Sequence, residues 1–141
     1  MIASDTLTIA SRTAAIDDAR TWLTAFLVPA GASVEAVWAT EMALTEALAN
    51  VITHAYGGDE SQKIHLSLEL HDDRCEIVIV DSGRPFDESA YEPPDFTEAR
   101  AGGYGVHLIG ELMDEVERTV TPDGGTRLRL VKRRWKEGSH D

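Results

Sequence analysis

Residues 44–54 read LTEALANVITH, and this stretch identifies the helix around which the fold is organised. Most of its residues are apolar, which predicts a largely buried helix. Glu46 and Asn50 interrupt the apolar pattern four residues apart, and His54 follows after the same interval. On a helix this spacing places side chains on one face. Such a pair is common on ordinary helix surfaces, but it could also contact a shared ligand.

The composition is typical of a globular domain. The chain has 141 residues, of which 43% are hydrophobic and 27% charged. This length predicts one domain, residues 1–141, that buries enough surface to fold without a cofactor or crosslink. No apolar run reaches the roughly 20 residues of a membrane span. The N-terminus lacks the basic and apolar regions of an export signal. We therefore expect a cytoplasmic protein without membrane contact.

Cysteine and histidine usage argues against crosslinks and structural metal. Cys75 is the only cysteine, so no internal disulfide can form. It lies in an apolar run, which predicts a packed thiol; a nucleophilic thiol is the alternative, and no surrounding motif supports it. The five histidines lack the spacing of zinc ligands, so we expect no structural zinc site.

The charge is strongly acidic overall but basic near the end of the chain. A net charge of −12 predicts repulsion from nucleic acid, so direct nucleic-acid binding is not expected. The last fifteen positions hold six of the thirteen basic residues. Two interpretations stay open: a solvated edge strand with a basic tail over residues 132–141, or a contact surface for an acidic partner. The six are Arg127, Arg129, Lys132, Arg133, Arg134 and Lys136.

Hydrophobic periodicity predicts a succession of strands and helices. Apolar residues alternate in the strands and recur every three or four residues in the helices. Ser33 is the expected N-cap of the long central helix. The predicted order is strand 5–11, helix 12–27, helix 33–55, strand 63–71, strand 75–81, loop 82–101, helix 106–116, strand 117–120 and strand 126–133.

These elements predict the fold class. Consecutive strands joined by short turns indicate antiparallel hairpins. With the helices on one face, they give an α+β two-layer sandwich whose sheet is mixed but mainly antiparallel. Residues 82–101 show no periodicity and hold three of the five prolines, which favours a lid or binding loop over a plain connector.

Two further features could carry chemistry. Asp81 ends an apolar strand and is followed by Gly83, a common way to terminate a strand. The carboxylate could instead accept a hydrogen bond from a ligand amino group, with Gly83 allowing close approach to the backbone. Gly103 and Gly105 precede the third helix and could free backbone N–H groups for phosphate, or act as a hinge. Their spacing matches neither a Walker A loop nor a dinucleotide-binding turn.

Taken together and in chain order, these features are more specific than any one of them alone. They are a helix with E-x-x-x-N, a strand ending in D-x-G, G-x-G before a later helix, and Gly-Thr entering the last strand. In this order they resemble the Bergerat ATP-binding fold of gyrase, histidine kinases and MutL. Within this GHKL superfamily, nearly the whole chain resembles the small anti-sigma-factor serine kinases of the RsbW and SpoIIAB type. TEALANVITHAY (45–56), VDSGRPFD (80–87) and GGYGVHLIGELMDEVE (102–117) carry the resemblance.

The resemblance implies a site for ATP or ADP with Mg²⁺. Asn50 matches the family's magnesium-binding asparagine, because Mg²⁺ takes oxygen ligands that it shares with substrate phosphates. Glu46 matches the general base that accepts the proton of an incoming serine hydroxyl. His54 extends the same helix face and is expected to lie among the nucleotide-binding residues.

The strand end would bind the base. Asp81 matches the residue that recognises the adenine amino group, with Gly83 beside it and Thr126 hydrogen-bonding near the base. Residues 84–101 would form the ATP lid. Pro85 stands where many superfamily members have a second glycine, which leaves the lid hinge in question.

The glycine-rich segment would bind the phosphates. Gly103 and Gly105 match the phosphate loop, and the backbone at His107 and Leu108 matches the start of the phosphate-facing helix. Arg100, just before the glycines, could neutralise phosphate charge. His107 replaces a more usual apolar residue, and a partly exposed helix position is its alternative interpretation.

The resemblance also implies partners. Such a kinase binds a sigma factor and, with ATP, phosphorylates a serine on a STAS-domain anti-anti-sigma protein. Arg20 matches an arginine that contacts both partners, although an ordinary exposed helix residue is an equal alternative. A homodimer is expected as well.

Three alternatives to a kinase remain. One is an ATP-binding partner-switching module that sequesters its partner without phosphotransfer. A second is the catalytic domain of a histidine kinase, which predicts an upstream phospho-acceptor helix pair; only about thirty residues precede the helix that carries Glu46 and Asn50, so we expect none. The third is an acidic scaffold without a ligand.

Overall fold

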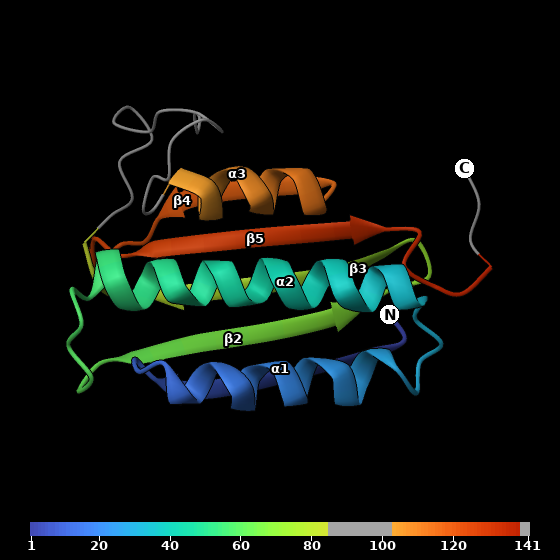
Figure 1. The fold of residues 1–141 in the computed structure, drawn as a ribbon, viewed down its shortest axis with the longest axis horizontal. Coiled ribbons are helices and arrows are strands. Elements are labelled where there is room, and N and C mark those ends of the chain that lie inside the picture. Colours follow the sequence, from blue (N-terminus) through green and yellow to red (C-terminus); the bar gives the residue numbers. More distant parts are fainter. Residues whose placement is uncertain (85–102, 139–141) are drawn as a thin grey trace.

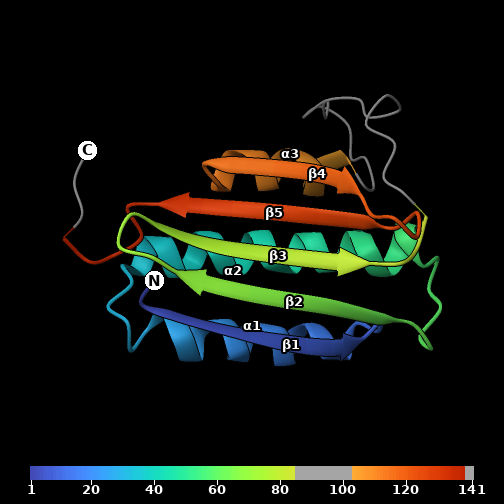
Figure 2. The same cartoon turned by 180° about the vertical axis from the view of Figure 1, so that it is seen from behind.

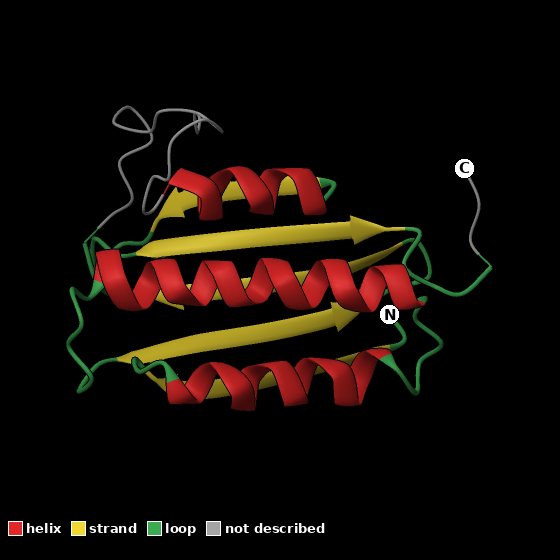
Figure 3. Cartoon of the chain, viewed as in Figure 1, coloured by secondary structure: helices red, strands yellow, loops and turns green. Residues whose placement is uncertain are grey.

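Helices cover one face of an open sheet in the part of the chain that the structure describes (Figures 1 and 3). The structure is a computed structural model that describes residues 1–84 and 103–138. Residues 85–101 of the predicted lid, Arg100 among them, and tail residues 139–141 lie outside this part. The elements are β1 (Ala3–Ala10), α1 (Ala14–Leu27), α2 (Val34–Asn50), η1 (Val51–Ala55), β2 (Lys63–Leu70), β3 (Arg74–Asp81), α3 (Gly103–Leu112), β4 (Glu115–Val120) and β5 (Thr126–Arg133).

The sheet has the strand order β1-β2-β3-β5-β4, and every pairing among the described strands is antiparallel. The predicted two-layer sandwich is confirmed, whereas the expected parallel component is not found among these strands. The chain leaves β3, passes through α3 to the outer strand β4, and returns as β5 between β3 and β4. β5 is therefore an interior strand, and its interpretation as an edge strand was wrong.

The core lies between the sheet and the helices. The predicted alternation of β2 is confirmed, since Ile64, Leu66, Leu68 and Leu70 are all buried. α2 lies between α1 and α3 in the helical layer (Figure 1) and buries alanine and leucine side chains. Seen from the other side, the strands carry no helix from residues 1–84 or 103–138 (Figure 2). α2 is thus the central support of the fold, as its apolar composition indicates.

Both ends of α2 follow from local chemistry. The Ser33 side chain accepts a hydrogen bond from the backbone nitrogen of Ala36 at 3.0 Å, which confirms the predicted N-cap. At the other end, Val51–Ala55 continues the helix as a π-helical turn, η1. Such turns are rare and often occur at functional sites. The predicted helix end near residue 55 is confirmed, but the change in helical geometry was not predicted.

α3 lies three to four residues nearer the N-terminus than predicted. It begins at Gly103, so Gly103 and Gly105 lie in its first turn rather than before it, and it ends at Leu112 instead of residue 116. Asp114 explains the early end. Its backbone nitrogen donates to Val131 at 2.8 Å, and its side chain accepts from the backbone nitrogen of Arg133 at 2.6 Å. The chain joins the sheet there, and the helix cannot continue.

Two smaller findings bear on the sequence predictions. Cys75 is fully buried, and burial raises the pKa of its thiol to about 12, as expected for a packed rather than a nucleophilic thiol. None of the helices in residues 1–84 and 103–138 has the length and hydrophobicity that a membrane span requires.

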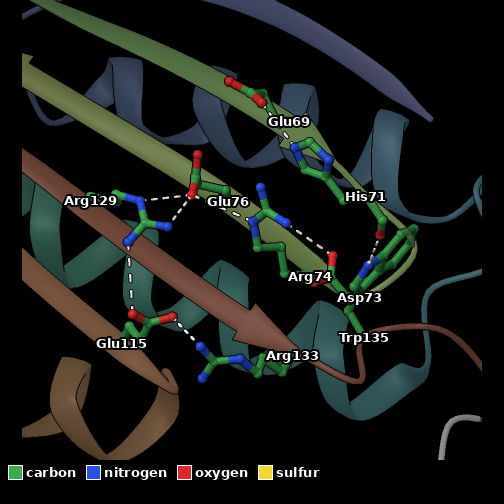
Figure 4. A network of polar contacts seen from close by, with 9 residues as sticks. All are labelled: Glu69, His71, Asp73, Arg74, Glu76, Glu115, Arg129, Arg133 and Trp135. Atoms are coloured by element: carbon green, nitrogen blue, oxygen red, sulfur yellow. Dashed lines mark hydrogen bonds and ion pairs between the residues drawn. The ribbon is translucent and has the colours of Figure 1, made fainter. Parts of the chain in front are cut away.

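The basic residues near the end of the chain pair with acidic neighbours (Figure 4). Arg129 on β5 contacts Glu76 of β3 at 2.5 Å and Glu115 of β4 at 3.9 Å. Arg133 also pairs with Glu115, and Lys136 contacts Asp72 at 2.6 Å. These contacts oppose the interpretation as a surface for an acidic partner, because much of the charge is already compensated within the chain.

Candidate functional site

Most of the predicted site residues gather at one end of the molecule. Asn50 is the last residue of α2, Asp81 the last of β3, Thr126 the first of β5 and Gly103 the first of α3. Figure 1 shows these four termini together at the left edge of the view. Segments that are more than seventy residues apart in sequence thus meet there, which is the arrangement that the predicted nucleotide site requires.

Gly83 joins the end of β3 to the end of the helix. The backbone nitrogen of Arg84 donates to the carbonyl oxygen of Ala55 at 2.8 Å, and the Arg84 side chain donates to the carbonyl of His54 at 3.2 Å. A Cβ atom at Gly83 would overlap the Ala55 backbone, so only glycine fits there. From the sequence we expected a ligand ring to approach the backbone at Gly83. In the structure, the Ala55 backbone lies where a side chain at Gly83 would be.

Asp81 is a buried carboxylate at the strand end, 4% exposed. One of its oxygens accepts a hydrogen bond from the backbone nitrogen of Gly83 at 2.9 Å. Burial raises the pKa of the Asp81 carboxyl above the usual value, and the nearby charge of Asp123 raises it further. Backbone hydrogen bonds from Gly83 and Thr126 lower this pKa but do not outweigh the effect of burial. The carboxyl is therefore costly to ionise and is held in a fixed position.

Thr126 lies directly opposite Asp81 across the β3–β5 pair and is 9% exposed. The preceding residue, Gly125, packs against the same strand end. A Cβ atom there would overlap the carbonyl oxygen of Asp81 and lie 2.8 Å from Cα of Ser82. The Gly-Thr pair predicted to enter the last strand therefore meets Asp81 because the glycine allows the close approach.

Tyr56 and Asp123 complete the junction and were not predicted as site residues. The Tyr56 hydroxyl accepts from the backbone nitrogen of Ser82 and donates to the carbonyl of Lys63, both at 2.7 Å. The Ser82 hydroxyl donates to Asp123 at 3.0 Å. Tyr56 ends the motif TEALANVITHAY, so its position was visible in the sequence, but its partners depend on tertiary structure.

Glu46 and Asn50 are half-buried on α2. Within the described residues, neither side chain forms a hydrogen bond or an ion pair. Glu41 of the same helix contacts Arg20 of α1 at 2.5 Å, which marks the side of α2 that faces α1. At about 100° per residue, Glu46 and Asn50 lie roughly 140° and 180° around the helix from Glu41. They therefore point toward the α3 side, where the predicted phosphate-binding segment begins.

The remaining predicted residues are less closely tied to this junction. His54 has an exposed side chain on η1. His107 and Leu108 are half-buried on α3, which packs beside α2 (Figure 1), and His107 lies 3.7 Å from Glu111 of its own helix. Arg20 is engaged by Glu41 and, at 3.5 Å, by Asp17.

Possible ligand contacts can be judged from the donor groups. No cluster of three or more His, Cys, Asp or Glu side chains suited to a metal occurs in residues 1–84 and 103–138. A hard cation beside Asn50 would therefore take the carboxamide oxygen together with ligand oxygens, as Mg²⁺ does with phosphates. An open pocket lies next to the junction, but Asp81, Glu46 and Asn50 do not line it. Its lining consists of Ala55, Tyr56, Gly57, Asp59, Gln62, Ser82, Gly83 and Arg84.

The fold and these residue positions define a class of protein, the histidine kinase-like ATPase domain. The family with that description matches residues 9–132. A solved structure of the RsbU and RsbW domains of Rv1364c from Mycobacterium tuberculosis superposes with a TM-score of 0.69 at 20% identity, covering 93% of this chain and 32% of that one. This similarity supports the fold alone.

Sequence relatives narrow the class. The chain is 39% identical to serine-protein kinase RsbW of Staphylococcus epidermidis, over 77% of this chain and 72% of the relative. It is 36% identical to serine-protein kinase RsbW of Oceanobacillus iheyensis, over 62% of this chain and 60% of the relative. The matches thus span about 60–72% of these relatives' lengths. The chain belongs to the RsbW-type serine-protein kinases of the histidine kinase-like ATPase family.

Proposed function

We propose that the chain is an ATP-dependent serine-protein kinase and anti-sigma factor, which sequesters a sigma factor and phosphorylates a STAS-domain antagonist. One observation carries this proposal. The buried carboxyl of Asp81, the face of α2 with Glu46 and Asn50, and the start of α3 lie at the same end of the molecule. Family membership supports the reaction class.

Each residue then has a role that its surroundings support. Asp81 receives the adenine amino group on the carboxylate oxygen that Gly83 leaves available. Asn50 holds Mg²⁺ through its carboxamide oxygen, and the ion neutralises phosphate charge when bound. Glu46 accepts the proton of the target serine hydroxyl. The first turn of α3, with Gly103 and Gly105, offers backbone N–H groups to phosphate.

The test is phosphotransfer from labelled ATP, with Mg²⁺, to a candidate STAS-domain protein. We expect Glu46→Gln to keep ATP affinity within about two-fold and to lower transfer by roughly 10²–10⁴-fold. Glu117→Gln is the control, since Glu117 is exposed on β4 and lies opposite Arg129, three positions along β5 from Thr126. Transfer unaffected by Glu46→Gln would refute the base assignment. ATP binding without transfer would indicate a module that only sequesters its partner.

We also propose that the chain forms a homodimer in the cytoplasm. The sheet face opposite the helices is the candidate contact, because no helix of the described residues covers it (Figure 2). Light scattering of the purified chain should give twice the monomer mass of 15.4 kDa. A monomer at all concentrations tested would refute the dimer but leave the kinase proposal standing.

A further inference from the structure

One carboxylate holds the turn between β4 and β5. An oxygen of Asp123 accepts hydrogen bonds from the hydroxyl of Thr121 and, at 3.3 Å, from the backbone nitrogen of Gly125. The other oxygen accepts from the hydroxyl of Ser82 at 3.0 Å. Two of the three contacts lie within the turn 121–125, so the turn stays closed when the Ser82 contact alone is lost.

Thr121 supports the same arrangement from the other side of the turn. Its hydroxyl accepts from the backbone nitrogen of Gly125 at 2.9 Å, and its own backbone nitrogen donates to the carbonyl of Gly125 at 3.0 Å. Hydrogen bonds from Thr121, and then those from Ser82 and Gly125, lower the pKa of the Asp123 carboxyl. Asp123 is therefore charged near neutral pH, and hydrogen bonds to a charged acceptor are stronger than neutral ones.

The turn ends in the two residues that meet the end of β3. Gly125 is buried, and a Cβ atom there would overlap the carbonyl oxygen of Asp81. Thr126, the first residue of β5, pairs directly with Asp81. Asp123 itself is exposed and adds nothing to the core. Its contribution is to hold Gly125 in the place where the turn contacts the strand end.

We propose that Asp123 is a positioning residue for base recognition, which keeps Asp81 and Thr126 where they distinguish adenine from a purine without the 6-amino group. The inference rests on the proposed nucleotide site and adds the residue that sets its selectivity. Asp123 acts through Gly125 and does not itself contact the nucleotide. Hydrogen bonds weaken steeply as their length and angle depart from the optimum, so a small shift of the turn is enough to reduce selectivity.

The rest of the proposed site lies on other elements. Asn50 ends α2, and Gly103 begins α3, where phosphate is expected to bind. The hydrogen bonds of Asp123 described above reach neither helix. Loss of Asp123 should therefore weaken recognition of the base and leave binding of the phosphates nearly unchanged. A carboxylate that only stabilised the turn would give no such difference.

Asp114 provides a matched control at the opposite end of the same hairpin. It is exposed and directly precedes β4, and its carboxylate accepts from the backbone nitrogen of Arg133 at 2.6 Å. It also lies 3.9 Å from the Nζ atom of Lys132. Asp114→Ala thus removes the contacts of an exposed carboxylate from this hairpin without altering Gly125.

The test compares two nucleotides by calorimetry on the full chain with Mg²⁺. One is ATP, and the other is purine riboside triphosphate, in which hydrogen replaces the 6-amino group. We expect the wild type to prefer ATP by about ten-fold or more, because the hydrogen bond to a charged acceptor is lost in the analogue. Asp123→Ala should bind ATP about five-fold more weakly and the analogue within about two-fold of wild type. Asp114→Ala should keep the wild-type preference.

Two further variants test the hydrogen bonds themselves. Asp123→Asn keeps an oxygen that accepts from Thr121 and Gly125, so it should retain most of the preference for ATP. Thr121→Ala removes the hydroxyl that bonds to both residues, and it should reduce the preference in the same direction as Asp123→Ala. Urea unfolding of each variant ensures that folded proteins are compared. Should Asp123→Ala fail to fold, Thr121→Ala provides the same comparison.

The outcomes separate this inference from the proposed function. A full preference for ATP in Asp123→Ala, or an equal loss for both nucleotides, would overturn the positioning role. Asp123→Asn as impaired as Asp123→Ala would overturn it too, since charge rather than hydrogen bonding would then matter. Equal binding of the two nucleotides by the wild type would refute the assigned role of Asp81 and this inference with it. That failure appears in the wild type, whereas failure of the inference alone appears only in the variants.

Discussion

The hydroxyl oxygen of Tyr56 accepts a hydrogen bond from the backbone nitrogen of Ser82 at 2.7 Å, and the hydroxyl donates to the carbonyl oxygen of Lys63, also at 2.7 Å. Tyr56 follows η1, Lys63 begins β2 and Ser82 follows β3. One side chain thus links the helix that carries Glu46 and Asn50 to the strand that carries Asp81. The relative position of the two halves of the proposed site depends on this contact.

Tyr56→Phe should therefore weaken both folding and nucleotide binding. The substitution keeps the ring and removes the hydroxyl, so the backbone nitrogen of Ser82 and the carbonyl of Lys63 lose their shared partner. We expect a loss of about 0.5–1.5 kcal/mol in the free energy of unfolding, measured with urea. ATP affinity, measured by calorimetry on folded protein, should fall as well, because Asp81 is less firmly placed.

Ser82→Ala is the control for Tyr56→Phe. It removes the exposed hydroxyl bond to Asp123 but keeps the backbone amide that Tyr56 accepts. We expect a change of at most about 0.5 kcal/mol and little effect on ATP. A Tyr56→Phe variant with wild-type ATP affinity would show that the link does not position the site.

Asp81→Asn should change how stability depends on pH. Burial raises the pKa of Asp81 in the folded state above its usual value near 3.8. The folded state therefore holds this proton more tightly than the unfolded state. The resulting stabilisation is complete below pH 3.8 and is lost as the pH rises through the raised pKa. Asparagine does not ionise, so the stability of Asp81→Asn relative to wild type should increase from pH 4 to pH 7.

Urea unfolding of both proteins at several pH values between 4 and 7 measures this difference. The same variant should lose the rise in melting temperature that ATP and Mg²⁺ cause in the wild type, because the amide disturbs recognition of the adenine amino group. A relative stability that falls with increasing pH would contradict the raised pKa. A retained nucleotide effect would contradict the assigned role of Asp81.

Local patterns predicted much of the fold. The Ser33 cap and the buried alternation of Ile64, Leu66, Leu68 and Leu70 were correctly predicted, because each depends on neighbouring residues. The interior position of β5 was not predicted, since strand order depends on a crossover that periodicity cannot reveal. The end of α3 was placed too late for a similar reason: Asp114 leaves the helix to bond with β5.

The candidate site, like the fold, was predicted from the sequence only in part. The termini of the elements that carry Asn50, Asp81, Thr126 and Gly103 meet as the motif order indicates. The Tyr56 link was missed, because a tyrosine at a helix end does not reveal which backbone groups it will meet. The role of Gly83 also differed from the prediction, which had a ligand approaching it. The neighbour that excludes a side chain at Gly83 is the Ala55 backbone, which belongs to another element.

Two serine-to-alanine substitutions should have opposite effects. Ser11 is fully buried, and its hydroxyl has no hydrogen-bond partner in the described part of the chain. Its removal relieves an unpaired polar group, so Ser11→Ala should raise the free energy of unfolding by about 1 kcal/mol. Ser33→Ala should lower it by about 1 kcal/mol, because the N-cap of α2 is lost. Urea titrations of both variants measure the signs, and a destabilised Ser11→Ala would indicate that its hydroxyl has a partner after all.

Gly125→Ala and Gly110→Ala form the last matched pair, and we again expect opposite signs. A methyl group at Gly125 would overlap the Asp81 carbonyl, so the β4–β5 turn must move away from the strand end. We expect a loss of about 1–3 kcal/mol or more, together with weaker ATP binding, because Asp81 and Thr126 are displaced. Gly110 is exposed within α3, and an added Cβ there meets no neighbour within 4 Å. Alanine at this helical position should stabilise the protein by about 0.5–1 kcal/mol. If both substitutions proved neutral in urea unfolding, the close packing of the turn against Asp81 would be wrong.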